Sequence, residues 1–136
     1  MKLYISASIR GADGEGASEH LQRHNILLAC QYAEALRKRY TEITWVCPHE
    51  NEFLNDLVFS GLIDEDLLVE AECHVIHHNQ TYDGVVHVGK WVPDSGCGKE
   101  IMAAHDAHKF YCFIDDTGER SREHFEVMLQ NWEKDD

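Results

Sequence analysis

The sequence has few basic residues. Its 12 lysines and arginines stand against 25 aspartates and glutamates, which gives a formal charge of −13 over 136 residues. A chain of this charge repels phosphodiester backbones and anionic membrane surfaces. A long uncharged apolar run and a signal-peptide pattern are also missing. We therefore expect a cytoplasmic protein whose partners include neither a nucleic acid polymer nor a membrane.

Paired cysteine motifs are missing as well. The 5 cysteines are an odd number and show no CxxC spacing, which indicates reduced thiols rather than disulfides or a zinc site. The 10 histidines include the segment "CHVIHH" from Cys73 to His78. There, the alternation of His74, Ile76 and His78 is typical of one face of a strand and does not match a zinc-ligand pattern. We expect no metal and no organic cofactor.

Two familiar phosphate-binding loops are absent. The segment "GADGEG" does not fit G-x-G-x-x-G, the fingerprint of dinucleotide binding. The segment "GCGKE" lacks the earlier glycine of a P-loop and the Ser or Thr that follows its lysine. The glycines around Cys97 therefore do not belong to either motif.

What is present is the pattern of a single globular domain over residues 1–136, with 43% hydrophobic and 27% charged residues. Short apolar or alternating segments predict strands at residues 2–9, 42–48, 74–79, 84–92 and 109–115. Helical spacing predicts helices at residues 18–40, 52–59, 62–72, 99–108 and 119–132, the first with Ser18 as N-cap.

This order of elements predicts an α/β fold. Strands that alternate with helices favour a mostly parallel five-stranded sheet with helices on both faces, a three-layer, Rossmann- or flavodoxin-like arrangement. The turn signal at Asp83 and Gly84 adds a hairpin near residues 74–92. Ligands of such sheets bind beyond the carboxyl ends of the strands. The segments "SIRGADG" and "DSGCGKE" follow predicted strands and are expected there.

Three of these segments together carry a family resemblance. The strand "LYISASIRG", the acidic helix with "DEDLL" and the helix-opening "DSGCGKE" resemble the nucleoside 2-deoxyribosyltransferase superfamily, which includes the 2′-deoxynucleoside 5′-monophosphate N-glycosidases. The resemblance extends over most of the chain. Its most specific part is a G-x-G-x-E core at Gly96, Gly98 and Glu100, preceded by Asp94, and Ser8–Gly11 matches the N-glycosidase branch.

The resemblance implies a set of catalytic residues. Glu100 would be the nucleophile that attacks the anomeric carbon, and a carboxylate at a helix N-terminus suits that role. Tyr4 falls on the family tyrosine that contacts this glutamate. Asp66 would protonate the departing base, with Asp64 and Asp83 as the alternatives.

The resemblance also implies substrate-binding residues and a reaction. Substrate contacts fall on Ser8, Ile9, Arg10, Gly11, Asp94, Gly96 and Gly98. We expect cleavage of the N-glycosidic bond of a small-molecule nucleoside or nucleotide through a glutamyl-glycosyl intermediate, with transfer of the sugar to another base or to water. The alternatives are a nucleoside 5′-monophosphate N-glycosidase and a binding module without turnover.

Two further expectations concern substrate charge and assembly. Asp94 would accept a hydrogen bond from a free 5′-hydroxyl and repel a phosphate, whereas Arg10 could offset that charge, so we expect unphosphorylated substrates to be preferred. Related proteins assemble as dimers or larger rings, so the resemblance implies a homodimer or higher homo-oligomer. The apolar face near Phe125 and Trp132 fits either such a contact or the core of one chain.

Overall fold

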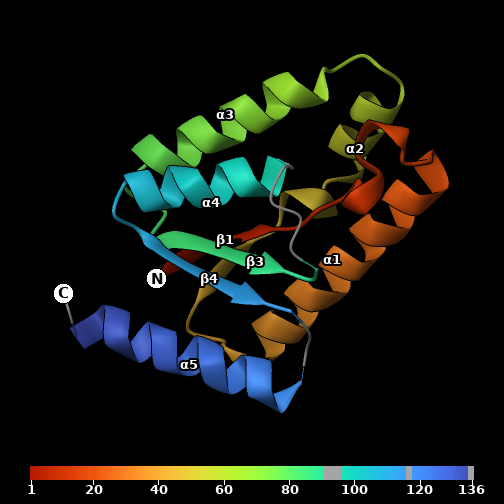
Figure 1. The fold of residues 1–136 in the computed structure, drawn as a ribbon. Coiled ribbons are helices and arrows are strands. Elements are labelled where there is room, and N and C mark those ends of the chain that lie inside the picture. Colours follow the sequence, from red (N-terminus) through yellow and green to blue (C-terminus); the bar gives the residue numbers. More distant parts are fainter. Residues whose placement is uncertain (91–95, 116–117, 135–136) are drawn as a thin grey trace.

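Four parallel strands form the sheet of this α/β protein. The computed structural model describes residues 1–90, 96–115 and 118–134, and within them the strand order is β2-β1-β3-β4 (Figure 1). The strands are β1 (Lys2–Ser6), β2 (Thr44–Val46), β3 (Gly84–Val88) and β4 (Phe110–Ile114). The chain therefore leaves β1 toward β2 on one side and returns to β3 on the other. At such a reversal the loops after the two central strands diverge and leave a crevice.

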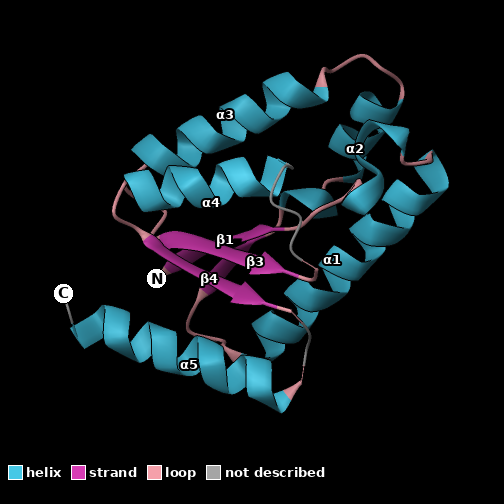
Figure 2. Cartoon of the chain, viewed as in Figure 1, coloured by secondary structure: helices cyan, strands magenta, loops and turns pink. Residues whose placement is uncertain are grey.

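Helices lie on either side of this sheet. Figure 2 shows α3 and α4 on one side and α1 and α5 on the other. The helices are α1 (Glu19–Arg39), α2 (Glu52–Phe59), α3 (Glu65–His78), α4 (Gly96–Asp106) and α5 (Glu119–Lys134), with short 3-10 turns η1 (Gly11–Gly16) and η2 (Pro48–Glu50). The helix predicted over residues 119–132 is confirmed by α5, and that predicted over residues 99–108 largely overlaps α4.

Each strand sends alternate side chains to the two sides of the sheet. Leu3 and Ile5 belong to a core cluster shared with Ala33 and Leu36 of α1 and Phe125 of α5. The intervening Tyr4 belongs to a second cluster, which also contains Ile76 of α3 and Ile101 and Ala104 of α4. This period of two follows from the pleat of a strand. It directs Tyr4 toward the α3 and α4 side, where the candidate site lies.

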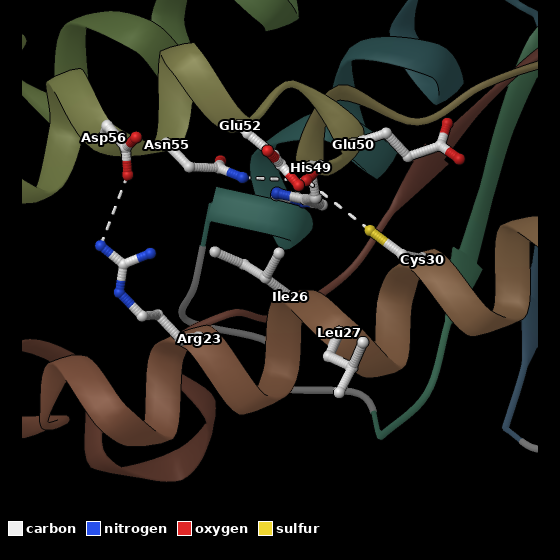
Figure 3. Close-up of a pocket in the computed structure, with 9 residues that line it drawn as sticks. All are labelled: Arg23, Ile26, Leu27, Cys30, His49, Glu50, Glu52, Asn55 and Asp56. Atoms are coloured by element: carbon white, nitrogen blue, oxygen red, sulfur yellow. Dashed lines mark hydrogen bonds and ion pairs between the residues drawn. The ribbon is translucent and has the colours of Figure 1, made fainter.

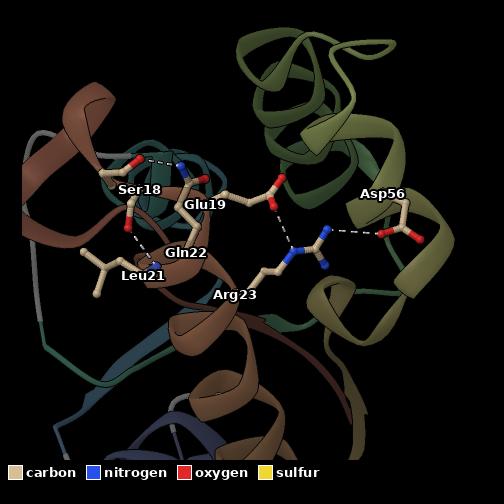
Figure 4. Close-up of polar contacts among 7 residues, drawn as sticks. Ser18, Glu19, Leu21, Gln22, Arg23 and Asp56 are labelled. Atoms are coloured by element: carbon tan, nitrogen blue, oxygen red, sulfur yellow. Dashed lines mark hydrogen bonds and ion pairs between the residues drawn. The ribbon is translucent and has the colours of Figure 1, made fainter.

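The start of α1 is fixed by a side-chain cap. The Ser18 hydroxyl accepts a hydrogen bond from the Leu21 amide at 3.1 Å, which satisfies a backbone donor that the first helical turn leaves free (Figure 4). Arg23, one turn later, reaches Glu19 and Asp56, each at 3.5 Å, and so links α1 to α2. The predicted N-cap at Ser18 is confirmed.

The prediction of a strand at residues 74–79 is wrong. The predictions of a fifth strand and of an extra hairpin near residues 74–92 depended on it and are wrong as well. Residues 74–78 are the last turns of α3, and the sheet has four strands in the described part of the chain. His74, Ile76 and His78 do not share one buried face, as their alternation suggested, because Ile76 is buried and the two histidines are exposed. The inward stripe of α3 has helical spacing instead and consists of Leu68, Val69, Glu72, Cys73 and Ile76.

Lysine 109 fixes the far end of α3. Its Nζ atom donates hydrogen bonds to the carbonyl oxygens of Ile76 at 2.6 Å and Asn79 at 2.7 Å. The last carbonyls of a helix lack intrahelical partners, so a cation at this position satisfies them and also opposes the negative end of the helix dipole. The C-terminal end of α3 is thereby attached to the segment that leads into β4.

The apolar face of α5 is part of the core of this chain. Phe125 is fully buried, and Met128, Leu129 and Trp132 pack against the cluster around it. Of the two interpretations of this face, the structure supports core packing. The oligomeric state stays a prediction.

Phe125 offers a test of this core. Its ring lies 4.9 Å from that of Tyr40 and 5.8 Å from that of Trp45, centroid to centroid. We expect Phe125→Ala to lower the free energy of unfolding by about 3–5 kcal/mol, because it removes buried area and leaves a cavity. Denaturant titration measures the change.

Phe53 of α2 is the matched control, because 74% of it is exposed. Phe53→Ala should change the free energy of unfolding by at most about 0.5 kcal/mol. Equal losses in the two variants would contradict the described packing of α5.

Candidate active site

Among the described residues, Glu100 is the acidic residue whose side chain is buried. It lies in the second turn of α4 and is only 4% exposed. Its Oε1 atom accepts a hydrogen bond from the hydroxyl of Ser6, the last residue of β1, at 3.0 Å. Its Oε2 atom is buried without a hydrogen-bond partner among the described residues. Buried polar atoms are nearly always paired, so an open carboxyl oxygen points to a proton or ligand that completes it.

Two further side chains surround this carboxyl. Tyr4 of β1 donates a hydrogen bond from its hydroxyl to Oε2 of Glu72 at 2.6 Å. Glu72 comes from the inward stripe of α3 and interacts electrostatically with Glu100. The end of β1, the middle of α3 and the start of α4 thus meet at one point.

The electrostatics of the cluster favour a protonated Glu100. Burial above all, and then the negative charge of Glu72, raise the pKa of Glu100 well above its usual value, while contact with the Tyr4 and Ser6 hydroxyls acts in the opposite direction. Burial, with the charges of Glu100 and Glu72, also raises the pKa of Tyr4 well above 10. Tyr4 therefore keeps its proton and acts as a hydrogen-bond donor.

A cavity of about 480 Å³ opens onto this cluster. It lies between the segment after β1, the first turns of α3 and the start of α4. This is the crevice that the strand order predicts, and its volume is in the range of small-molecule sites. Its wall contains Ala7, Ser8, Ile9, Arg10, Gly11, Gly14, Glu15, His49, Glu65, Asp66, Leu68, Val69, Glu72, Gly96, Cys97, Lys99 and Glu100.

The loop after β1 is held by local hydrogen bonds. The Ser8 hydroxyl accepts a bond from the Gly11 amide at 3.2 Å, and Asn25 of α1 donates to the Ile9 carbonyl at 2.7 Å. Gly11 has a φ of +64°, a conformation that glycine adopts without strain. Arg10 forms an ion pair with Glu65 at the start of α3. The loop is thereby tied to both α1 and α3.

The cavity brings together most of the side chains proposed from the sequence. Its wall includes the proposed nucleophile Glu100, the proposed proton donor Asp66 and five of the proposed binding residues, Ser8, Ile9, Arg10, Gly11 and Gly96. Tyr4 does not line the cavity and reaches it through Glu72. Gly98 is buried in α4 and lines a groove between α3 and α4 instead. Asp94 lies outside the described residues.

The two alternative proton donors have other roles. Asp64 is the N-cap of α3, where its Oδ1 atom accepts a hydrogen bond from the Asp66 amide at 2.8 Å. Asp83 precedes β3 and accepts a bond from the Lys2 amide at 2.7 Å. Because β3 begins at Gly84, Asp83 lies at the opposite end of that strand from the cavity. Neither residue lines the cavity.

Sequence reasoning missed Ser6 and Glu72. Ser6 could have been found, because the alternation of β1 places it on the same side as Tyr4. Glu72 could also have been found from a helical period through Leu68, Val69 and Ile76, but this signal was obscured by the strand-like alternation of the following histidines. Glu65, Lys99 and His49 carried no comparable signal.

A second cavity, of about 650 Å³, lies between α1, η2 and α2 (Figure 3). In its wall the backbone carbonyl of His49 accepts hydrogen bonds from the side-chain Nδ2 atom of Asn55 at 2.9 Å and from the Cys30 thiol at 3.7 Å. These contacts are structural. We take the cavity at Glu100 as the candidate active site because a buried carboxyl belongs to its wall. His49 lines both cavities.

The described ranges contain neither a candidate metal centre nor a helix that could span a membrane. In residues 1–90, 96–115 and 118–134, no group of three or more His, Cys, Asp or Glu side chains is placed to hold a metal ion. The helices of these ranges lack the combination of length and apolar character needed to cross a bilayer.

Comparison with known proteins adds no family to this description. Nothing among family models, curated proteins and solved structures matches the chain. The resemblance to the deoxyribosyltransferases therefore depends on the motif residues alone. The burial and hydrogen bonding of Glu100 are a second observation, which does not depend on that resemblance.

The buried carboxyl predicts a pH-dependent stability difference. Because the folded protein holds the Glu100 proton more tightly than the unfolded chain, its contribution to stability is full below the unfolded value of about 4.3 and is lost as the pH rises toward the raised folded value. Glutamine does not titrate and keeps the acceptor for Ser6. We expect Glu100→Gln to raise the melting temperature at about pH 7.5 more than at about pH 4.

The matched control is Glu123→Gln, at an exposed position of α5. It should shift the melting temperature little at either pH. If Glu100→Gln gives the same shift at both pH values, the carboxyl ionises in the folded protein as readily as an exposed glutamate does.

Proposed function

We propose that this protein cleaves the N-glycosidic bond of a nucleoside or deoxynucleoside, with Glu100 as the nucleophile. The observation that carries the proposal is the buried Oε2 atom of Glu100, which has no hydrogen-bond partner among the described residues and belongs to the wall of a 480 Å³ cavity. A carboxyl kept out of water and free on one oxygen is suited to attack an electrophilic carbon bound beside it. The family resemblance supplies the identity of that carbon.

The reaction has two steps. In the first, Glu100 gives its proton to solvent and a carboxylate oxygen bonds to the anomeric carbon, while the bond from that carbon to the base nitrogen breaks and its electron pair passes to the base. In the second, water or another base attacks the same carbon and releases the carboxylate. A covalent ester divides one difficult cleavage into two easier displacements. Ser6, which donates to Oε1, would orient the attacking carboxyl.

A neutral base needs a proton in order to leave. Asp66 is our proposed donor because it lines the cavity without being part of the Tyr4 and Glu72 hydrogen bond. Glu72 is the second candidate because it lies beside Glu100 and also lines the cavity. Positioned acids of this kind contribute about 10²- to 10⁴-fold to a rate.

A nucleoside 5′-monophosphate N-glycosidase is the alternative activity. The observation in its favour is that Arg10 and Lys99 line the cavity, and both side chains bind phosphate well. Arg10 is, however, already paired with Glu65. A phosphate would have to displace that carboxylate.

The nucleophile is tested by Glu100→Gln. Incubation with deoxynucleosides, with and without a second base, should show base release or exchange by the unaltered protein and a loss of orders of magnitude in the variant. Mass spectrometry of the quenched unaltered protein should show one bound sugar on the peptide that contains Glu100. Glu123→Gln should retain full turnover, and circular dichroism verifies that both variants are folded.

A near-normal rate in folded Glu100→Gln would remove Glu100 from the nucleophile role. Ligands that raise the melting temperature of the unaltered protein yet stay chemically intact would instead identify a binding module without turnover.

The proton donor is tested by comparing Asp66→Asn with Glu72→Gln on two leaving groups. Asp66→Asn should slow the cleavage of neutral nucleosides by about 10²- to 10⁴-fold. It should leave the cleavage of a nitrophenyl 2-deoxyriboside nearly unchanged, because nitrophenolate departs without a proton. The same selective loss in Glu72→Gln alone would transfer the role from Asp66 to Glu72.

A further inference from the structure

The wall of the active-site cavity is rich in acids. It contains five carboxyl side chains, Glu15, Glu65, Asp66, Glu72 and Glu100, and two cationic ones, Arg10 and Lys99. Burial lowers the pKa of the wall histidine, His49, to about 4, so its imidazole is neutral near pH 7. With Glu100 protonated, the formal charge of the wall is two units negative.

The two cations do little to offset these acids within the cavity. Arg10 and Glu65 form an ion pair and offset one another, and only about a third of each of the two side chains is exposed. Lys99 of α4 is exposed, as are the acids Glu15 and Asp66 at the outer part of the wall. The acids, by contrast, include Glu72 and Glu100 at the inner end of the site, where the first is half-buried and the second almost wholly buried.

The Oε2 atom of Glu100, buried without a hydrogen-bond partner among the described residues, offers a bound ligand a polar contact at this inner end. Negative walls of low dielectric concentrate cations and exclude anions. A neutral nucleoside gains nothing from this field, and a 5′-monophosphate is opposed by it. A ligand with a positive charge on its ring system would be attracted.

We propose that the preferred substrate is a nucleoside whose base carries a positive charge, such as an N-alkylated purine or a pyridinium nucleoside. This inference rests on the proposed glycosidic cleavage and names the class of base on which it acts. The wall acids that are not paired with Arg10, namely Glu15, Asp66 and Glu72, would attract the cation and keep it beside the nucleophile.

Cleavage of such a base balances without a donated proton. Glu100 gives its proton to solvent, its carboxylate oxygen bonds to the anomeric carbon, and the bond from that carbon to the base nitrogen breaks. The electron pair of the broken bond cancels the positive charge, so a neutral base departs. Water then hydrolyses the ester, and the sum is a cationic nucleoside plus water giving free sugar, neutral base and one proton.

The cation would also activate the nucleophile. An opposite charge within about 4–6 Å favours the ionised form of a carboxyl, so the bound substrate lowers the pKa of Glu100 from its raised value. A phosphate at the same site would raise that pKa further. Burial and Glu72 thus favour the acid form of Glu100, and a cationic substrate would favour the carboxylate when it binds.

Two pairs of probes test the preference, each composed of a cation and a neutral molecule of nearly the same shape. They are N7-methylguanosine with guanosine, measured at about pH 6 so that the methylated base keeps its charge, and nicotinamide riboside with benzamide riboside, its uncharged carbon-linked isostere. Binding is measured by calorimetry on Glu100→Gln, so that no probe is consumed. We expect the cation of at least one pair to bind about tenfold tighter or more, and less so in added salt.

Substitutions of acidic and of basic wall residues should change the preference for the cationic probe in opposite directions. Glu65→Gln and Asp66→Asn, each added to Glu100→Gln, should reduce the preference for the cation several-fold. Arg10→Gln should increase it, because Glu65 then lacks its cationic partner. Glu123→Gln on α5 should leave it unchanged. Equal changes in all four variants would indicate a general loss of structure and overturn the assignment to this wall.

Other outcomes separate this inference from the proposed function. Equal affinity within both pairs, no binding of either cation at millimolar concentration, or tighter binding of guanosine 5′-monophosphate than of either cation would overturn the charge preference. Base release from neutral nucleosides by the unaltered protein would then still uphold the glycosidic activity. Selective binding of a cation without base release from any nucleoside would overturn the activity, and with it this substrate assignment.

Discussion

The burial of one carboxyl group is the constraint around which this structure is arranged. Glu100 is removed from water at the point where β1, α3 and α4 meet, and an ionised carboxylate in such a place carries a large desolvation cost. The structure meets that cost by holding the group as an acid and by giving Oε1 a donor in Ser6. The proposed chemistry depends on the reverse step, in which a bound ligand makes ionisation favourable.

The second carboxyl, that of Glu72, makes the ionisation of Glu100 still less favourable. Glu72 raises the cost of ionising Glu100, and Tyr4 donates its proton to Glu72. Replacement of these groups by apolar side chains of similar volume would remove unfavourable terms from folding, as it does for many buried ionic groups. Their presence in a cavity wall is therefore better explained by a site than by stability. Strongly perturbed acids cluster at functional sites for the same reason.

The sequence predicted the parts of the fold that local chemistry decides. Ser18 caps α1 and Pro48 follows β2, as their side chains require. The end of α3 could not be read in this way, because "HVIHHN" alternates like a strand. Its helical state depends on the packing of Ile76 in one cluster with Tyr4, which is distant in sequence. The same limit applies to the site. The glycine motif located Glu100, whereas its contacts with Ser6 and Glu72 arise only when three separate segments come together.

Attachment at both ends gives α3 a fixed axial position. Arg10 pairs with Glu65 in its first turn, and Lys109 binds its last carbonyls. One helical turn is about 5.4 Å long, so even a fraction of a turn of sliding would separate Glu72 from Tyr4. Arg10 and Lys109 thus hold α3 at the position that sets the distance between the half-buried Glu72 and the buried Glu100. Loss of either cation would let α3 shift along its axis, and the proton affinity of Glu100 would then change because its distance from Glu72 had changed.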